Sequence, residues 1–179
     1  MSKIGKINKL KVKRRVEFGV YLELDSAEHG SGDQGKASIG MDNFGAHTFA
    51  PTEVLLPRRF VPESIQIGDE LEVFICFDSE DRLIATTEIP FATVGECAQL
   101  EVRSVEDVGA FLDWGLSKDL FLPFSEQTRG LKPGQEIIVF IYLDKSGRIS
   151  ASMRIDRNLK NPIDDLEEGQ SVQLLIYGK

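Results

Sequence analysis

The sequence contains little of what redox, secreted and membrane proteins need. It has only two cysteines among 179 residues, and no apolar run approaches the ~20 residues that span a bilayer. Cys76 and Cys97 lie in apolar stretches without metal-type spacing, so buried reduced thiols are favoured over a disulfide. The N-terminus has no signal-peptide core. These features predict a cytoplasmic protein without a membrane segment.

Motifs for catalysis are missing as well. The sequence has no phosphate-cradling loop or zinc signature, and Ser125 in "FSEQ" lacks the flanking glycines of a nucleophile elbow. The two histidines, His29 and His47, lie near acidic residues but without the clustered spacing of metal ligands. We therefore expect no enzymatic activity, no cofactor and no metal.

Positive charge is scarce overall but concentrated at one end. The formal net charge is −8, which argues against a generic polyanion binder because phosphate contacts need clustered cations. The first sixteen residues nevertheless contain seven basic residues and no acidic one. A nucleic-acid surface and an edge strand protected by lysines both fit this segment. Lys11 and Lys13 are its candidate nucleic-acid contacts.

The sequence does contain an internal repeat. Residues 5–22 align with 95–112 at an offset of 90, pairing Gly19 with Gly109, and residues 55–86 align with 121–152 at an offset of 66. The difference of 24 indicates an insertion in the first unit, within the polar, glycine-rich residues 23–53. This insertion is expected to form a long surface loop.

The repeat predicts the domain organisation. Residues 1–90 are assigned to a first domain with the insertion around 23–53, and residues 91–156 to a second. Residues 157–179 are assigned to a polar linker and the first strand of an incomplete third unit, which begins at "GQSVQLLIYGK". The natural chain is therefore expected to continue past Lys179.

Each unit has the sequence pattern of about five short strands. "ELEVFICFD" and "EIIVFIYLD" are β-branched and aromatic, and the turns "DSEDR" and "DKSGR" then lead into "LIAT" and "ISAS". A short helical turn is expected between the third and fourth strands. Closing into a small barrel is the economical way for such strands to bury their apolar faces. The predicted fold is all-β, with tandem five-stranded antiparallel OB-fold barrels.

The residues in these units resemble the S1 RNA-binding domain. "GAFLDWG" and "DKSGRISAS" in the second unit are close to S1 patterns, and "EVLLPRRFVPE", "ATTE" and "GAFLDWGLSKDL" together resemble the conserved virulence factor B family. That family comprises bacterial cytosolic proteins in which successive S1 domains are followed by a winged-helix domain. The winged helix has no counterpart in this sequence.

The resemblance implies a set of RNA-binding residues. In S1 domains the RNA face comprises one aromatic residue before the turn glycine, a second after it, a histidine on the third strand, and the Asp and Arg of the last hairpin. The corresponding residues are Phe18, Tyr21, Asp78 and Arg82 in the first unit and Phe111, Asp144 and Arg148 in the second. Arg58 and Arg59 either extend the basic track or solvate a loop.

The sequence departs from the S1 pattern at three positions. Pro57 and Pro123 replace the histidine, and Val108 replaces the leading aromatic residue of the second unit. The loss of both the histidine and the leading aromatic residue should weaken the second unit. Strand alternation places Trp114 on the face opposite Phe111, so it is expected in the core or at an interdomain contact.

A non-catalytic protein that binds single-stranded RNA is the predicted function, with a regulatory role implied by the family alone. Without the resemblance, the aromatic residues would be assigned to the core and the Asp–Arg pairs to surface ion pairs. A protein-binding adaptor is the main alternative, because the same barrel also serves protein contacts and the chain is acidic. Salt dependence would distinguish the two functions. The sequence does not indicate the target RNAs, the role of the insertion or the oligomeric state.

Overall fold

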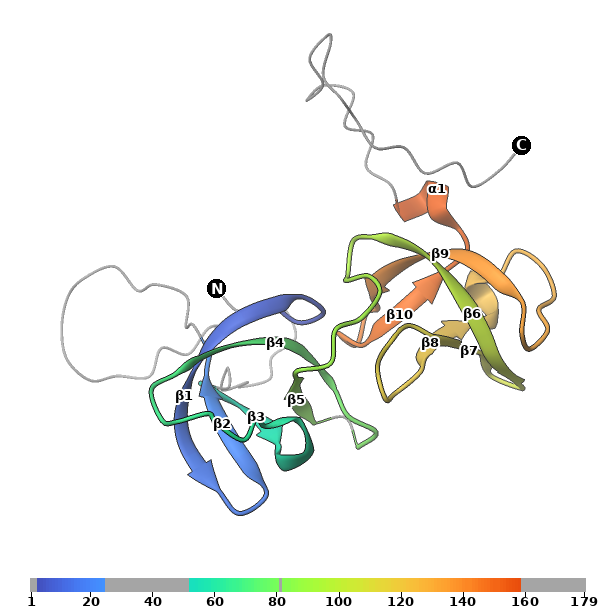
Figure 1. Ribbon diagram of the computed structural model, residues 1–179. Coiled ribbons are helices and arrows are strands. Elements are labelled where there is room, and N and C mark those ends of the chain that lie inside the picture. The colour runs from blue at the N-terminus through green and yellow to red at the C-terminus, as the bar shows by residue number, and fades with distance from the viewer. Residues whose placement is uncertain (1–2, 25–51, 81, 159–179) are drawn as a thin grey trace, which may run out of the picture. The chain divides into compact units, whose positions relative to one another are not determined.

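The computed structural model describes residues 3–24, 52–80 and 82–158. The chain divides into two compact units, one comprising residues 1–75 and 83–87 and the other residues 76–82 and 88–179. Strands make up most of the regular structure, and they close into two five-stranded barrels (Figure 1). In the described part of the chain, no helix is long and apolar enough to cross a membrane.

The two barrels have the same strand order. The first is formed by β1 (Ile7–Val16), β2 (Gly19–Glu23), β3 (Glu53–Pro57), β4 (Glu70–Phe77) and β5 (Leu83–Thr86), in the order β1-β2-β3-β5-β4. The second is formed by β6 (Cys97–Glu106), β7 (Gly109–Asp113), β8 (Leu120–Pro123), β9 (Glu136–Leu143) and β10 (Ile149–Ser152), in the order β6-β7-β8-β10-β9. Three short helical segments complete the described elements: η1 (Arg58–Phe60), η2 (Phe124–Glu126) and α1 (Ile155–Asn158).

Each barrel contains one parallel strand pair. β3 pairs with β5 and β8 pairs with β10 in parallel, whereas the other recorded pairs are antiparallel. The sequence predicts antiparallel barrels, and closure adds one parallel pair to each, because an odd number of strands cannot alternate direction all the way round a ring. The tandem OB-fold architecture itself is confirmed, including a 3-10 turn after the third strand of each barrel.

Alternation along the strands fills both barrel interiors. In β1 and β2 the inward-facing residues include Leu10, Val12 and Leu22, which are almost completely buried. Their counterparts at the offset of 90 are Leu100, Val102 and Leu112, which are equally buried. The residues that repeat in the sequence are therefore those that line the inside of each barrel. The insertion within 23–53 falls largely outside the described residues, and the third unit falls wholly outside them. The domain limits of 1–90 and 91–156 remain predictions.

Trp114 is buried, as the strand alternation predicts. Its exposed fraction is 4%, and its indole Nε1 donates a hydrogen bond to the carbonyl oxygen of Lys118 at 2.6 Å. The two cysteines are free thiols, as expected, and both are half-buried. Burial raises the pKa of Cys76 to about 11, so its thiolate is scarce at neutral pH.

In each barrel, one position lies so close to the backbone carbonyl of a neighbouring strand that only glycine fits. A Cβ atom at Gly19 would lie 2.2 Å from the carbonyl oxygen of Leu56, and one at Gly109 would lie 2.4 Å from that of Leu122. Gly19 pairs with Pro57 and Gly109 with Pro123, at equivalent places in the β2–β3 and β7–β8 ladders. The two glycines that align in the sequence thus meet the same steric demand.

Replacing either of these glycines should destabilise its barrel. We expect Gly19→Ala and Gly109→Ala each to lower the free energy of unfolding by about 1 to 3 kcal/mol, because the new methyl group must displace a backbone carbonyl. Urea denaturation followed by circular dichroism measures the change. Gly130→Ala is the matched control, since nothing lies within 4 Å of a Cβ at that position. Equal midpoints for all three variants would contradict the expectation.

Candidate nucleic-acid interface

Tyr21 lies on the outer wall of the first barrel. Val20 and Leu22 on either side of it are buried, whereas Tyr21 is half-buried and faces outward. Its cross-strand partners are Arg14 on β1 and Leu55 on β3. The sequence-based assignment of Tyr21 to the outside of the barrel, which rested on the S1 resemblance, therefore agrees with the register of the strands.

A β-bulge places Arg14 beside Tyr21. Leu10 and Val12 face the core, so simple alternation would also direct Arg14 inward, but the β1–β2 register shifts between Val12 and Arg14. The guanidinium carbon of Arg14 consequently lies 3.8 Å from the centroid of the Tyr21 ring. This distance is well within the range of a cation–π contact.

Phe18 extends this cluster towards the β1–β2 turn. Its ring contacts Tyr21 edge-on, with centroids 6.5 Å apart and planes at 81°, and its exposed fraction is 56%. The backbone N–H of Arg58 donates to the carbonyl oxygen of Phe18 at 2.9 Å, so the start of η1 lies next to the same turn. Phe18, Tyr21 and Arg14 thus form one exposed aromatic–cationic cluster. The sequence analysis did not select Arg14.

An acidic residue partly neutralises the cations of this wall. Glu53, the first residue of β3, accepts bonds from Arg14 Nε at 2.9 Å and from Lys13 Nζ at 3.2 Å. Hydrogen bonds from Arg14 and Lys13 hold the pKa of Glu53 below its usual value, so it is ionised at neutral pH. Lys11 is exposed and faces Glu23 and Glu70 in the two neighbouring strands.

The second barrel has a similar group of ion pairs but lacks the stacked arginine. Arg103, the counterpart of Lys13, bonds Asp113 at 2.8 Å and Asp119 at 3.4 Å. The counterpart of Arg14 is Ser104, which pairs with Phe111. Phe111 instead contacts Phe121, with ring centroids 5.4 Å apart and planes at 42°.

A row of cross-strand neighbours crosses the outer wall of the second barrel, with the buried Ser150 in its middle. Phe111 pairs with Phe121, Phe121 with Ser150, and Ser150 with Tyr142. The sequence analysis selected Phe111 but not Phe121 or Tyr142. Alternation within "EIIVFIYLD" puts Tyr142 on the face opposite the buried Ile141, so its outward position could have been predicted from the sequence. The neighbours of Phe111 could not, because they depend on the strand register.

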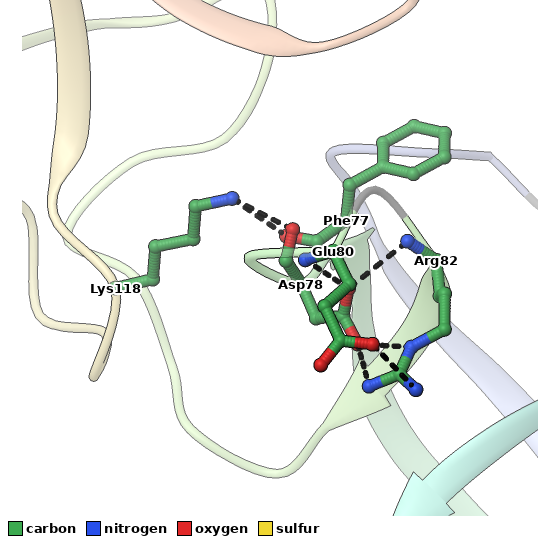
Figure 2. A network of polar contacts seen from close by, with 5 residues as sticks. All are labelled: Phe77, Asp78, Glu80, Arg82 and Lys118. Atoms are coloured by element: carbon green, nitrogen blue, oxygen red, sulfur yellow. Dashed lines mark hydrogen bonds and ion pairs between the residues drawn. The ribbon is translucent and has the colours of Figure 1, made fainter.

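The Asp–Arg pairs of the two hairpins form tight turns. Asp78 accepts hydrogen bonds from the backbone N–H groups of Glu80 and Arg82, both at 2.9 Å. The guanidinium of Arg82 bonds Asp78 at 2.8 Å and Glu80 at 2.9 Å. Figure 2 shows this network of Asp78, Glu80 and Arg82.

Asp144 has the same structural role in the second barrel. Its Oδ1 accepts bonds from the backbone N–H groups of Ser146 and Arg148, at 2.8 and 3.0 Å, and from the Ser146 hydroxyl at 2.6 Å. Burial by itself raises the pKa of Asp144, but these hydrogen bonds outweigh it and hold the pKa below its usual value. Both aspartates therefore define the hairpin backbone from which Arg82 and Arg148 project.

The remaining candidate residues are basic and exposed. Arg58 and Arg59 form the start of η1, and the guanidinium of Arg59 lies 4.5 Å from the centroid of the Phe60 ring. Arg148 is exposed at the end of its hairpin. Among the described residues, no group of three or more His, Cys, Asp or Glu side chains could hold a metal ion; His29 and His47 lie outside this part of the chain.

Comparisons with known proteins identify the family to which this architecture belongs. A family model described as the S1 domain matches residues 48–88 and 94–154. The chain belongs to the S1 domain family. This match, together with the relatives below, confirms the resemblance noted in the sequence.

Three relatives illustrate the similarity. The uncharacterised protein YitL of Bacillus subtilis (strain 168) is 40% identical over 85 residues, which cover 47% of this chain and 27% of YitL. Conserved virulence factor B of Staphylococcus saprophyticus is 23% identical over 123 residues, covering 64% of this chain and 41% of that protein. The crystal structure of a multidomain protein with nucleic acid binding domains from Streptococcus pneumoniae TIGR4 aligns with a TM-score of 0.58 at 17% identity, covering 83% of this chain and 45% of that one. The chain spans less than half the length of each relative.

Asp144 should matter more for the turn than for any ligand. We expect Asp144→Ala to lower the free energy of unfolding by about 1 to 2 kcal/mol, because two backbone N–H groups lose their acceptor. Asp144→Asn keeps an acceptor and should cost less. Since the folded-state pKa is lowered, the carboxylate stabilises the fold above its unfolded pKa of about 3.9, and this stabilisation disappears as the pH falls through the folded value.

Urea midpoints measured between acidic and neutral pH test both parts of this prediction. The difference between the wild-type protein and Asp144→Asn should shrink as the solution is acidified. A difference that is constant over the whole range would show that the ionised carboxylate does not stabilise the turn.

Proposed function

We propose that the chain binds single-stranded RNA through the outer wall of its first barrel, without catalysing a reaction. The observation that carries this proposal is the exposed cluster in which Arg14 stacks on Tyr21 and Phe18 meets Tyr21 edge-on. An unstacked base offers a flat face to such a ring, and an arginine beside the ring adds charge to the contact. Membership of the S1 domain family and the nucleic acid binding domains of the pneumococcal protein support a nucleic-acid ligand.

Single-stranded RNA fits this wall better than a duplex. The bases of a single strand are already exposed, whereas a duplex must be opened or read through its grooves. Lys11, Lys13, Arg58 and Arg59 are proposed to contact the phosphates, since all four are exposed on the first barrel. The cations of β1 thus offer a local track within a chain of net negative charge.

The second barrel is proposed to contribute less affinity. Phe111 and Arg148 are its proposed contacts, but Ser104 stands where Arg14 lies in the first barrel, and Val108 stands where Phe18 lies. Asp78 and Asp144 are proposed to act through the hairpins that carry Arg82 and Arg148, because their carboxylates are bonded within the turns. A regulatory role in the cytoplasm is part of the proposal and is supported by the family resemblance alone.

Replacement of the stacked residues should weaken RNA binding in a graded way. We expect Tyr21→Ala to raise the Kd for labelled poly(U) at least about fivefold, since stacking on one ring contributes ~1 to 3 kcal/mol. Tyr21→Phe should bind almost normally because it retains the ring. Arg14→Lys should bind more weakly than wild type because it keeps the charge but loses the planar group, and Phe111→Ala should have a smaller effect than Tyr21→Ala.

Fluorescence anisotropy at two salt concentrations measures these effects. The wild-type affinity should fall steeply as salt rises, as expected for contacts that release counterions from phosphates. If Tyr21→Ala, Arg14→Ala and Phe111→Ala all bound poly(U) and poly(A) as the wild type does, the assigned surface would be wrong.

Glu53 should restrain RNA binding. Its carboxylate bonds both Lys13 and Arg14 and therefore competes with phosphate for these cations. We expect Glu53→Gln to bind poly(U) a few-fold more tightly at low salt and with a steeper dependence on salt, since two charges are no longer neutralised. Glu63→Gln, an exposed acid elsewhere in the first unit, is the control and should leave the affinity unchanged. Weaker binding by Glu53→Gln would indicate that the carboxylate mainly positions Arg14.

A further inference from the structure

The second barrel has an exposed apolar patch at one end of the β7–β8 ladder, formed by Val108, Phe121, Pro123 and Phe124. Val108 and Phe124 are large apolar residues with exposed fractions of 61% and 51%. Gly109, the residue after Val108, pairs with Pro123, the residue before Phe124. The ring of Phe121 lies against Gly109, since a Cβ there would be 2.8 Å from its Cε2 atom. The four side chains therefore belong to one continuous piece of surface.

The equivalent surface of the first barrel contains an arginine. At the offsets of the repeat, Val108 corresponds to Phe18 and Phe124 corresponds to Arg58. The hydrogen bond from the Arg58 N–H to the Phe18 carbonyl oxygen shows that these two positions adjoin in the first barrel. At this surface the first barrel has an arginine where the second has an exposed phenylalanine, a difference that favours an apolar partner over phosphate.

The strand that leads into this surface is also more acidic in the second barrel than in the first. Residues 9–18 contain five basic residues and one acidic residue, whereas the equivalent residues 99–108 contain one basic and three acidic residues. Glu106, the last residue of β6, and Asp107 are exposed and directly precede Val108. Arg154, whose Nε donates to the carbonyl oxygen of Ser125 at 2.9 Å, brings one cation near Phe124. The carboxylates beside Val108 would repel an RNA backbone.

We propose that this apolar patch is a docking site for a partner protein, and that the docked segment carries apolar side chains next to lysine or arginine. Burial of Val108 and Phe124 removes apolar surface from water and supplies the attraction. Glu106 and Asp107 attract the basic residues of the segment and orient it. A protein docked at this patch would add to the RNA contacts proposed for the two barrels, so the inference goes beyond RNA binding and does not depend on it.

Selection from a phage-displayed library of random dodecapeptides against the whole chain tests this inference. The selected peptides should be enriched in apolar residues adjoining lysine or arginine. Val108→Ser and Phe124→Ser should each weaken binding of a selected peptide at least about tenfold, as expected for an apolar residue at the centre of an interface. Ile67→Ser is the matched control, because Ile67 is an exposed apolar residue (66%) outside the patch. Both patch variants are surface changes, and thermal melting verifies their folding.

Charge reversal provides a second, independent readout. The double variant Glu106→Lys with Asp107→Lys should weaken the same peptide, whereas Glu63→Lys should not. Failure to select any peptide, or selection of peptides that bind all variants equally, would overturn the proposal. Loss of poly(U) binding in Val108→Ser and Phe124→Ser to the extent seen with Tyr21→Ala would assign the patch to RNA. Self-association of the chain that these two substitutions abolish, measured by sedimentation, would assign it to a second copy.

Discussion

A closed ring of five strands cannot alternate direction at every step, and this constraint determines where the functional groups lie. One pair must be parallel, and here it is β3 with β5 and β8 with β10. The chain therefore cannot return from the third strand through a tight hairpin and passes through a 3-10 turn instead. In the first barrel that turn begins with Arg58, whose backbone bonds Phe18. Barrel closure thus brings a basic connection next to an exposed aromatic residue.

The sequence predicts the fold well because the fold depends on short-range patterns. Strand alternation, turn residues and the two offsets of the repeat are enough to predict two five-stranded barrels and the burial of Trp114, whereas the outward position of Tyr21 is predicted only with the S1 resemblance. The repeat is readable because the inner walls are built from matching residues, such as Leu22 with Leu112. The glycines that align, Gly19 and Gly109, meet the same steric demand in each copy.

The candidate site is less predictable because it depends on which strands are neighbours and in what register. Alternation from Leu10 and Val12 assigns Arg14 to the core, and only the bulge between Val12 and Arg14 brings it over Tyr21. The pairing of Lys13 with Glu53 joins residues that are far apart in the sequence. Phe121 and Tyr142 likewise become neighbours of the Phe111 row through the ladders of the second barrel.

Both first strands carry their bulge at the same place, between Val12 and Arg14 and between Val102 and Ser104. Because strand pleating separates inner from outer residues, selection can act on the two walls independently. The buried residues are nearly the same in the two barrels, whereas the outer wall beside the bulge has Arg14 in the first barrel and Ser104 in the second. Two barrels in one chain thus share a core while presenting different outer walls, and each wall offers its own set of side chains to a ligand.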